Sequence, residues 1–158
     1  MKRIYAIEDW CVDCKRCEVA CRVFHSESKD PVKAYRFEDD LAPSRVHVEG
    51  DEHLSIAVNC RHCDEPKCVE GCISGAMQKD PDTGLVTSDP IKCVGCRTCI
   101  SFCPFGAVKV VSIKKRDKAL KCDLCGEVLG EPGTPRCVEV CPNRALIYVE
   151  SEEPHYVQ

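Results

Sequence analysis

The sequence predicts a loop-rich α+β fold built from small strand–loop–helix units. Sixteen of the 158 residues are cysteine, a density typical of chains held together by disulfides or bound metal. Aromatic residues make up only 6% of the chain and include one Trp, so a large side-chain core is not expected. Short stretches rich in Val, Ile and Tyr flank the cysteines, as in short strands.

The cysteines form four groups of four, so a fourfold internal repeat is the main feature of the sequence. Groups one and three share the spacing CxxCxxCxxxC, whereas the second gap widens to four residues in group two and to 11 in group four. The groups are Cys11, Cys14, Cys17, Cys21; Cys60, Cys63, Cys68, Cys72; Cys93, Cys96, Cys99, Cys103; and Cys122, Cys125, Cys137, Cys141.

The expected strands lie on either side of these groups. Those before a group are 4–7, 54–58, 85–87 and, weakly, 119–120; those after a group are 75–77, 107–111 and 145–149. The turn sequence KDPDTG at 79–84 predicts a hairpin between two of them.

Helices are expected to be single turns between the third and fourth cysteines of a group. Examples are residues 18–20 and 100–102. The charged segment 27–50 has no cysteine and contains Pro31 and Pro43, so we expect a linker or a partner-facing loop there.

The spacing of the cysteines suits a cubane iron–sulfur cluster. Three thiolates at i, i+3 and i+6 in an irregular loop can wrap one cluster, while the fourth lies beyond the loop and faces elsewhere. In bacterial two-cluster ferredoxins this fourth cysteine binds the other cluster, and a proline commonly follows it. Pro104 and Pro142 match that pattern, whereas Arg22 and Ile73 take the equivalent places in groups one and two. Four [4Fe-4S] clusters are therefore expected.

Other cysteine chemistries remain as alternatives. Structural zinc also uses CxxC pairs, and groups two and four resemble such sites most. Eight disulfides would suit a secreted chain, and a thioredoxin-like site needs only one exposed CxxC. His62 lies between two cysteines, and we expect a surface or supporting histidine rather than a ligand. Trp10 precedes Cys11 and is expected to shield a cluster from water.

Charge and hydropathy limit the possible partners. The net charge is −4 with scattered basic residues, so no nucleic-acid partner is expected. The basic run at 114–118 is either a solvated linker or a docking patch. No apolar stretch reaches the length of a membrane span, and no export signal precedes the first cysteine, so we expect a cytoplasmic protein without direct membrane insertion. Export together with a signal-bearing partner stays open.

Basic residues inside the cysteine loops have two interpretations. They either offset the negative charge of the clusters, and so tune their potentials, or only serve solubility. These residues are Lys15, Arg16, Arg61, Lys67, Arg97 and Arg136.

The order of the groups, the wide fourth group and the string CRHCDEPKC at 60–68 resemble a known family. It comprises four-cluster ferredoxin-type electron-transfer subunits of the dimethyl-sulfoxide-reductase, formate-dehydrogenase and formate-lyase type. The resemblance covers about residues 4–149, and the chain is similar to the small members of the family.

The resemblance implies two bacterial-ferredoxin-like modules of two [4Fe-4S] clusters each, one nested in the other. Residues 51–112 form the inner module, and residues 1–50 plus 113–158 form the outer one. The implied ligands are set A, Cys11, Cys14, Cys17 and Cys141; set B, Cys60, Cys63, Cys68 and Cys103; set C, Cys93, Cys96, Cys99 and Cys72; and set D, Cys122, Cys125, Cys137 and Cys21.

The function implied is single-electron transfer, because a cubane with four thiolates has no open coordination site. No nucleophile–base pair or nucleotide fingerprint is found, so the chain is not expected to be an enzyme on its own. The family pairs such subunits with a large catalytic subunit, here expected to be a molybdenum or tungsten pterin aldehyde or formate oxidoreductase. The second redox partner is expected to be a flavin subunit using NAD, a ferredoxin, or another copy of the chain itself. Alternatives are a relay subunit of a hydrogenase or a carbon monoxide dehydrogenase, a free polyferredoxin and, remotely, a zinc-stapled interaction module.

Overall fold

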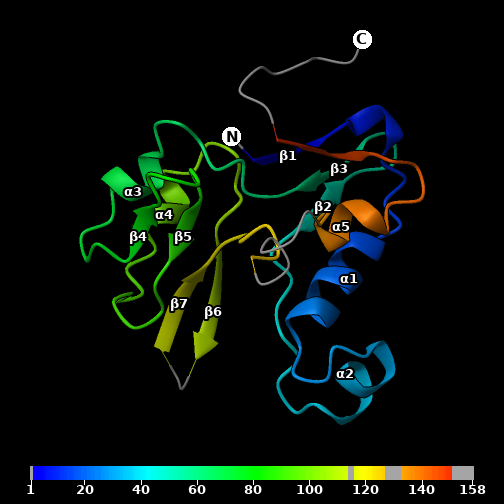
Figure 1. Ribbon diagram of the computed structural model, residues 1–158, viewed down its shortest axis with the longest axis horizontal. Helices are drawn as coiled ribbons and strands as arrows, with labels where there is room; N and C mark the ends of the chain where they lie inside the picture. The colour runs from blue at the N-terminus through cyan, green and yellow to red at the C-terminus, as the bar shows by residue number, and fades with distance from the viewer. Residues whose placement is uncertain (1, 114–115, 127–132, 151–158) are drawn as a thin grey trace.

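The computed structural model describes residues 2–113, 116–126 and 133–150, which form a small, loop-rich arrangement of helices and strands (Figure 1). The helical elements are η1 (Glu8–Trp10), α1 (Arg16–His25), α2 (Pro31–Phe37), α3 (Lys67–Glu70), α4 (Thr98–Ser101) and α5 (Arg136–Glu139). The strands are β1 (Arg3–Ala6), β2 (His47–Gly50), β3 (Ser55–Val58), β4 (Met77–Lys79), β5 (Val86–Ser88), β6 (Lys109–Ile113), β7 (Arg116–Leu120) and β8 (Leu146–Val149).

Within the described residues the strands form antiparallel pairs: β1 with β8, β2 with β3, β4 with β5, and β6 with β7. The β4–β5 pair confirms the hairpin predicted around residues 79–84. The β1–β8 pair joins the two ends of the described chain, with Ile4 opposite Tyr148. Among the described helices, none combines the length and the apolar composition that crossing a membrane requires.

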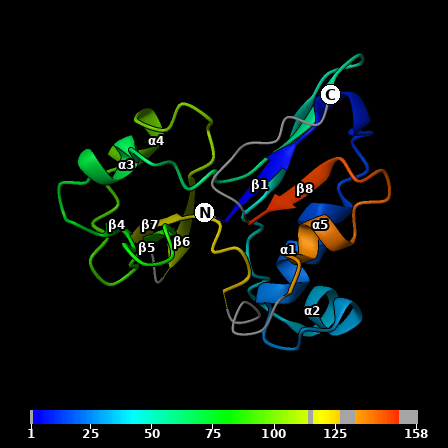
Figure 2. The ribbon, with the colours of Figure 1, turned by 45° about the horizontal axis from the view of Figure 1, so that its top comes forward.

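The elements gather in two halves that are visible in both views (Figures 1 and 2). The α3–α4 half also contains β4, β5, β6 and β7, and the α1–α5 half contains α2, β1, β2, β3 and β8. Helix α1 packs against α5, and α3 packs against α4.

Each half has a core in which cysteines accompany a few apolar side chains. One core includes Ile4, Val46 and Leu146 together with five cysteines, and the other includes Met77 and Val86 together with three. These small cores agree with the composition. Whatever the thiols hold must contribute to folding, because binding free energy at such sites is also folding free energy.

The segment 27–50 is more ordered than the expected linker. Helix α2 begins at Pro31, in the first helical position that proline favours, and the Lys33 N–H donates to the Asp30 carboxylate at 2.9 Å. Strand β2 at the end of the segment pairs with β3. The expectation of a linker was therefore wrong, because the segment forms a helix and a strand, whereas its facing a partner stays a prediction. Asp30-Pro31 is a recognisable helix-start signal.

The basic run at 114–118 is only partly described. Residues 114 and 115 lie outside the described residues, whereas Arg116 and Lys118 belong to β7. The interpretation as a solvated linker is therefore wrong for residues 116–118, which lie in a strand.

Candidate metal centres

Each CxxC loop contains a residue in the left-handed backbone conformation, directly before the second cysteine. These residues are Asp13, His62, Gly95 and Leu124, with φ of 51°, 44°, 76° and 53°. Such a conformation is uncommon outside glycine, so its recurrence at the same place in all four groups indicates one shared loop geometry.

Gly95 has a second constraint besides its backbone conformation. A Cβ at this position would lie 2.5 Å from the carbonyl oxygen of Asp117, so a larger residue would clash with β7.

The third cysteine of every group sits at the start of a short helix. Helices α1 and α4 follow the left-handed residues Lys15 and Arg97, whereas α3 and α5 follow Pro66 and Pro135. All four third cysteines are buried: Cys17, Cys68, Cys99 and Cys137. Two different helix starts therefore produce the same buried thiol.

Backbone N–H groups point at several thiols, as is expected for ligand thiolates. In the loops, His62 donates to Cys60 Sγ and Leu124 donates to Cys122 Sγ, both at 3.4 Å. A thiolate that accepts such bonds is stabilised, and the same bonds adjust the potential of a cluster bound there.

Three of the four fourth cysteines accept N–H bonds too. Met77 donates to Cys72 Sγ at 3.4 Å and Ala145 donates to Cys141 Sγ at 3.2 Å, both within five residues along the chain. The donor to Cys21 Sγ is different, because it is the N–H of Arg45, at 3.2 Å.

Three cavities are each lined by four cysteines, three from one group and one from another. The first is lined by Cys72, Cys93, Cys96 and Cys99. The second is lined by Cys11, Cys14, Cys17 and Cys141. The third is lined by Cys21, Cys122, Cys125 and Cys137.

The remaining four cysteines, which line none of these three cavities, are Cys60, Cys63, Cys68 and Cys103. Cys68 Sγ accepts a hydrogen bond from Lys121 Nζ at 3.2 Å, and the Cys60 thiol also interacts with that ammonium group. Cys103 packs against both cores, one containing Cys60 and the other containing Cys68. Cys63 is half-buried and follows His62 in the loop.

Burial raises the pKa of several of the cysteine thiols and so opposes their ionisation. It raises the pKa of Cys17 and of Cys122 to about 12 and holds the pKa of Cys137 well above its usual value, with neighbouring thiols adding to the effect. Such thiols become thiolates only when a positive metal centre replaces their protons.

Cys21 is an exception among the buried thiols. Burial acts to raise its pKa, but hydrogen bonds from His25 and from the Arg45 N–H outweigh burial and lower that pKa overall. The His25 ring donates from Nδ1 to the Cys21 carbonyl oxygen at 2.7 Å, and its Nε2 lies 3.2 Å from the Asp123 carboxylate. Asp123 also accepts from Arg45 Nη1.

The donor set fits [4Fe-4S] clusters. Four thiols surround each of the three cavities, and backbone N–H groups supply additional donors. Among the described residues, no three His, Cys, Asp or Glu side chains converge on a point that could hold a single metal ion. A bound cluster of this kind would supply one-electron redox chemistry.

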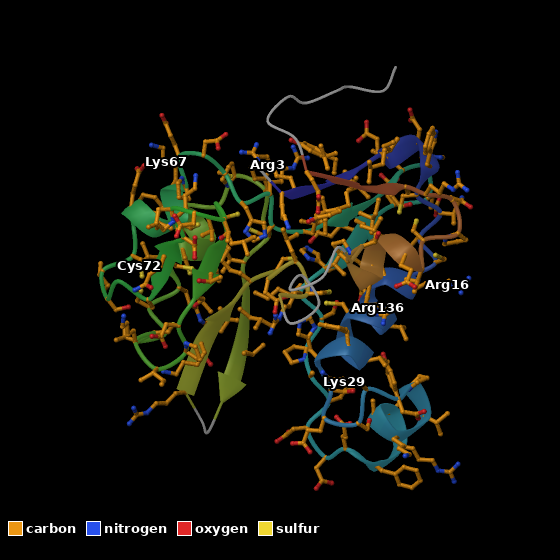
Figure 3. All side chains as sticks on the ribbon, in the orientation of Figure 1. Arg3, Arg16, Lys29, Lys67, Cys72 and Arg136 are labelled. Atoms are coloured by element: carbon orange, nitrogen blue, oxygen red, sulfur yellow. The ribbon has the colours of Figure 1, made fainter. Side chains whose placement is uncertain are left out.

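The basic residues expected to offset cluster charge pair mostly with nearby carboxylates. The nitrogen–oxygen distances are 3.7 Å for Lys15–Asp13, 3.0 Å for Lys67–Glu70 and 2.6 Å for Arg136–Glu139, and Arg97 pairs with Asp117. Arg61 instead stacks over the Phe105 ring, at 4.5 Å from its centroid. Figure 3 labels Lys67 and Cys72 in the α3–α4 half and Arg16 and Arg136 in the α1–α5 half.

Sequence reasoning missed Lys121, whose Nζ lies 3.2 Å from Cys68 Sγ. It is only 6% exposed, and although burial lowers its pKa, the Cys60 and Cys68 thiols outweigh burial and raise that pKa overall. Its position directly before Cys122 was the available signal, but it lies outside every CxxC loop.

Two further expectations concern His62 and Trp10. The surface location considered for His62 is wrong, because the residue is fully buried and its Nδ1 accepts the Val86 N–H at 2.9 Å. Trp10 lines the cavity of Cys11 and is 47% exposed, so its shielding role stays a prediction.

Comparison with known proteins agrees with this chemistry. Residues 52–151 match the family model of the 4Fe-4S dicluster domain. The chain belongs to this family. The ferredoxin-type iron–sulfur electron-transfer family expected from the sequence is thereby confirmed, and the presence of [4Fe-4S] clusters with it.

Three curated proteins from Escherichia coli are similar to this chain over most of its length. YsaA, named an electron transport protein, is 38% identical over 90% of this chain and 86% of its own. Electron transport protein HydN is 37% identical over 89% of this chain and 83% of its own. YnfG, named a probable anaerobic dimethyl sulfoxide reductase chain, is 36% identical over 90% of this chain and 70% of its own.

Proposed function

We propose that this chain carries four [4Fe-4S] clusters, held by sets A, B, C and D, and relays single electrons between two redox partners. The observation that carries the proposal is the set of three cavities, each lined by four cysteines in the combinations of sets A, C and D. Set B is supported by Cys60 and Cys68 around Lys121 and by the packing of Cys103.

The proposed organisation is two modules, with residues 51–112 nested inside a module formed by residues 1–50 and 113–158. The pairing of β1 with β8 supports an outer module built from both ends of the chain. Strand β7 pairs with β6, so it connects the modules just after their proposed boundary.

The order of the sets along the relay is proposed to be C, B, D, A. Helix α3, which carries Cys68 of set B, contacts α4, which carries Cys99 of set C. The Cys68 thiol also contributes to the pKa of Cys99, which is raised mainly by burial. Sets B and D meet where Cys60 contributes to the raised pKa of buried Cys122. Helix α1, which carries Cys17 of set A, contacts α5, which carries Cys137 of set D.

The two ends of this order are where electrons would enter and leave. Of the cysteines, Cys14 in set A and Cys96 in set C are exposed. Exposed apolar side chains accompany each of them, Val12 beside Cys14 and Val94 beside Cys96. Short distances to a partner's redox group are possible only at such exposed edges.

The proposed partner at one end is a large catalytic subunit, with a molybdenum or tungsten pterin aldehyde or formate oxidoreductase as the first candidate. One relative of the chain, YnfG, is named a probable dimethyl sulfoxide reductase chain, and this name supports a large reductase subunit as the partner. The chain itself would be a non-catalytic subunit working in the cytoplasm, and the second partner a flavin subunit or a ferredoxin.

Anaerobic purification from the native cells tests both parts of the proposal. The protein should contain about 16 irons per chain, four per cluster, and give paramagnetic signals on reduction. Stoichiometric zinc instead of iron would overturn it. A co-purifying large subunit with molybdenum or tungsten would support the proposed partner, and a chain that purifies alone would favour a free polyferredoxin.

A further inference from the structure

Lys121 occupies an unusual position for a lysine. It lies between β7 and Cys122, its side chain is 6% exposed, and its Nζ donates to Cys68 Sγ at 3.2 Å. The Cys60 thiol is a second partner of the ammonium group. Within the described part of the chain no carboxylate pairs with Lys121, so sulfur is its acceptor.

A buried ammonium group needs a compensating negative charge. Removing it from water is strongly unfavourable unless a paired and hydrogen-bonded anion is present. Cys60 and Cys68 supply that anion when they are ligand thiolates of a cluster, since such a cluster has a net charge of about −2. The burial and the sulfur contacts of Lys121 are therefore those expected for an ammonium group beside an anionic cluster held by set B.

Two other lysines near the cysteines, Lys67 and Lys118, are arranged differently. Lys67 precedes Cys68 in the chain, but its side chain is 55% exposed and pairs with Glu70. Lys118 lies on β7 with its Nζ 2.5 Å from the carbonyl oxygen of Cys93 rather than from a thiol. Only the Lys121 charge combines deep burial with a direct bond to a ligand sulfur among these three.

We propose that Lys121 raises the reduction potential of the cluster held by Cys60, Cys63, Cys68 and Cys103. The inference rests on the proposed four-cluster function. Reduction adds one electron to the cluster, with no bond or proton change, and increases its negative charge by one. A nearby positive charge stabilises the reduced form more than the oxidised form, and burial leaves that charge poorly screened.

The location of Lys121 also predicts which cluster's reduction potential the ammonium charge changes most. Its Nζ bonds to a thiol of set B, while the next residue, Cys122, belongs to set D. The effect should be largest at set B, smaller at the neighbouring sets C and D and smallest at set A, because Coulomb interactions weaken with distance and with screening.

The test is a redox titration of reconstituted full-length protein, followed by paramagnetic resonance, for the wild type and Lys121→Met. Methionine retains the length and apolar stem of the side chain without its charge. We expect the equilibrium constant for reduction of one component to fall about tenfold, which is 59 mV for a one-electron couple. Lys121→Arg retains the charge and should keep every component within about twofold of the wild type.

Lys67→Met is the matched control, because it removes a lysine adjacent to Cys68 whose charge is exposed and paired with Glu70. It should change no component by more than about twofold. Should Lys121→Met lose iron, Lys121→Gln serves for the same measurement, since it is neutral but can still donate to sulfur.

The iron content of the wild type separates this inference from the proposed function. Fewer clusters than four in the wild type would contradict the proposed function itself. A full complement of iron in the neutral Lys121 variant with all potentials unchanged, or with all of them shifted equally, would overturn the role of Lys121 alone.

Discussion

Groups one and three have the same cysteine spacing but continue into different structures. Helix α1 runs for 10 residues and passes Cys21, whereas α4 has four residues and ends before Cys103. The residue after the fourth cysteine contributes to this difference, although it does not set the helix length in every group, since α3 also ends before Cys72 with Ile73 after it. Pro104 cannot continue a helix, while Arg22 can.

The longer helix changes how the fourth thiol is supported. In groups two and four the chain turns at Gly75 and Arg144, both with positive φ, and nearby N–H groups donate to Cys72 and Cys141. Group one has no such turn because α1 continues, and Arg45 supplies the donor instead. The segment that contains α2 and β2 thus replaces a local turn.

The comparison teaches that identical cysteine spacing does not fix how the fourth thiol is supported, because a longer helix leaves that support to a remote segment. The remote support in group one is reinforced by Asp123, which contacts both Arg45 and His25. Four variants or pairs of variants test how far the two kinds of group are equivalent.

The largest effect is expected from removing matched third cysteines, Cys17→Ala and Cys99→Ala. If both groups hold clusters on the same plan, each variant should lose about four irons. Stability should fall by about 10 kcal/mol, as for structural metal sites. Iron analysis and chemical unfolding measure both effects. A clear inequality between the two variants in iron lost would break the proposed equivalence.

The second prediction exchanges the helix-ending signal. Arg22→Pro introduces a proline into the interior of α1 and should reduce the free energy of unfolding by about 3 kcal/mol. Pro104→Ala changes an exposed residue after Cys103 and should cost less than about 1 kcal/mol. Urea unfolding of both variants measures the difference. Equal costs would mean that residue 22 does not determine the length of α1.

The third prediction concerns the remote support of Cys21. Asp123→Ala removes the carboxylate that contacts Arg45 and His25 and that accepts the Cys125 N–H at 3.1 Å. We expect a loss of about 1–2 kcal/mol, because these groups are only partly screened. Asp123→Asn can still accept hydrogen bonds and should lose less. An Asp123→Ala variant as stable as the wild type would show that Asp123 does not contribute to the support of Cys21.

The smallest effect is expected at the start of α2. Asp30→Ala removes the cap on the Lys33 N–H and should cost about 1 kcal/mol, measured by thermal unfolding. Asp30→Asn retains a capping oxygen and serves as the control. A larger effect on iron retention than on stability would indicate that α2 acts directly on the Cys21 site.

Local features of the fold were predictable from residues close together in the chain. The turn at 79–84 identified the β4–β5 hairpin, and several apolar stretches became β1, β3, β5, β6 and β8. The cysteine spacing identified the 4Fe-4S family, because ligands within one loop must meet one compact body. The start of α2 was readable at Asp30-Pro31 but was interpreted as a linker.

The sequence by itself determined the cysteine repeat, the family and most of the short strands, since each depends on near neighbours in the chain. Tertiary structure alone decided the burial of His62, the Arg45 donor to Cys21 and the contact of Lys121 with Cys68. The family resemblance already implied that Cys141 joins Cys11, and the tertiary structure brings the two to one cavity because β1 pairs with β8 and α1 packs against α5. Burial and long-range hydrogen bonds depend on how distant segments pack, which no local spacing encodes.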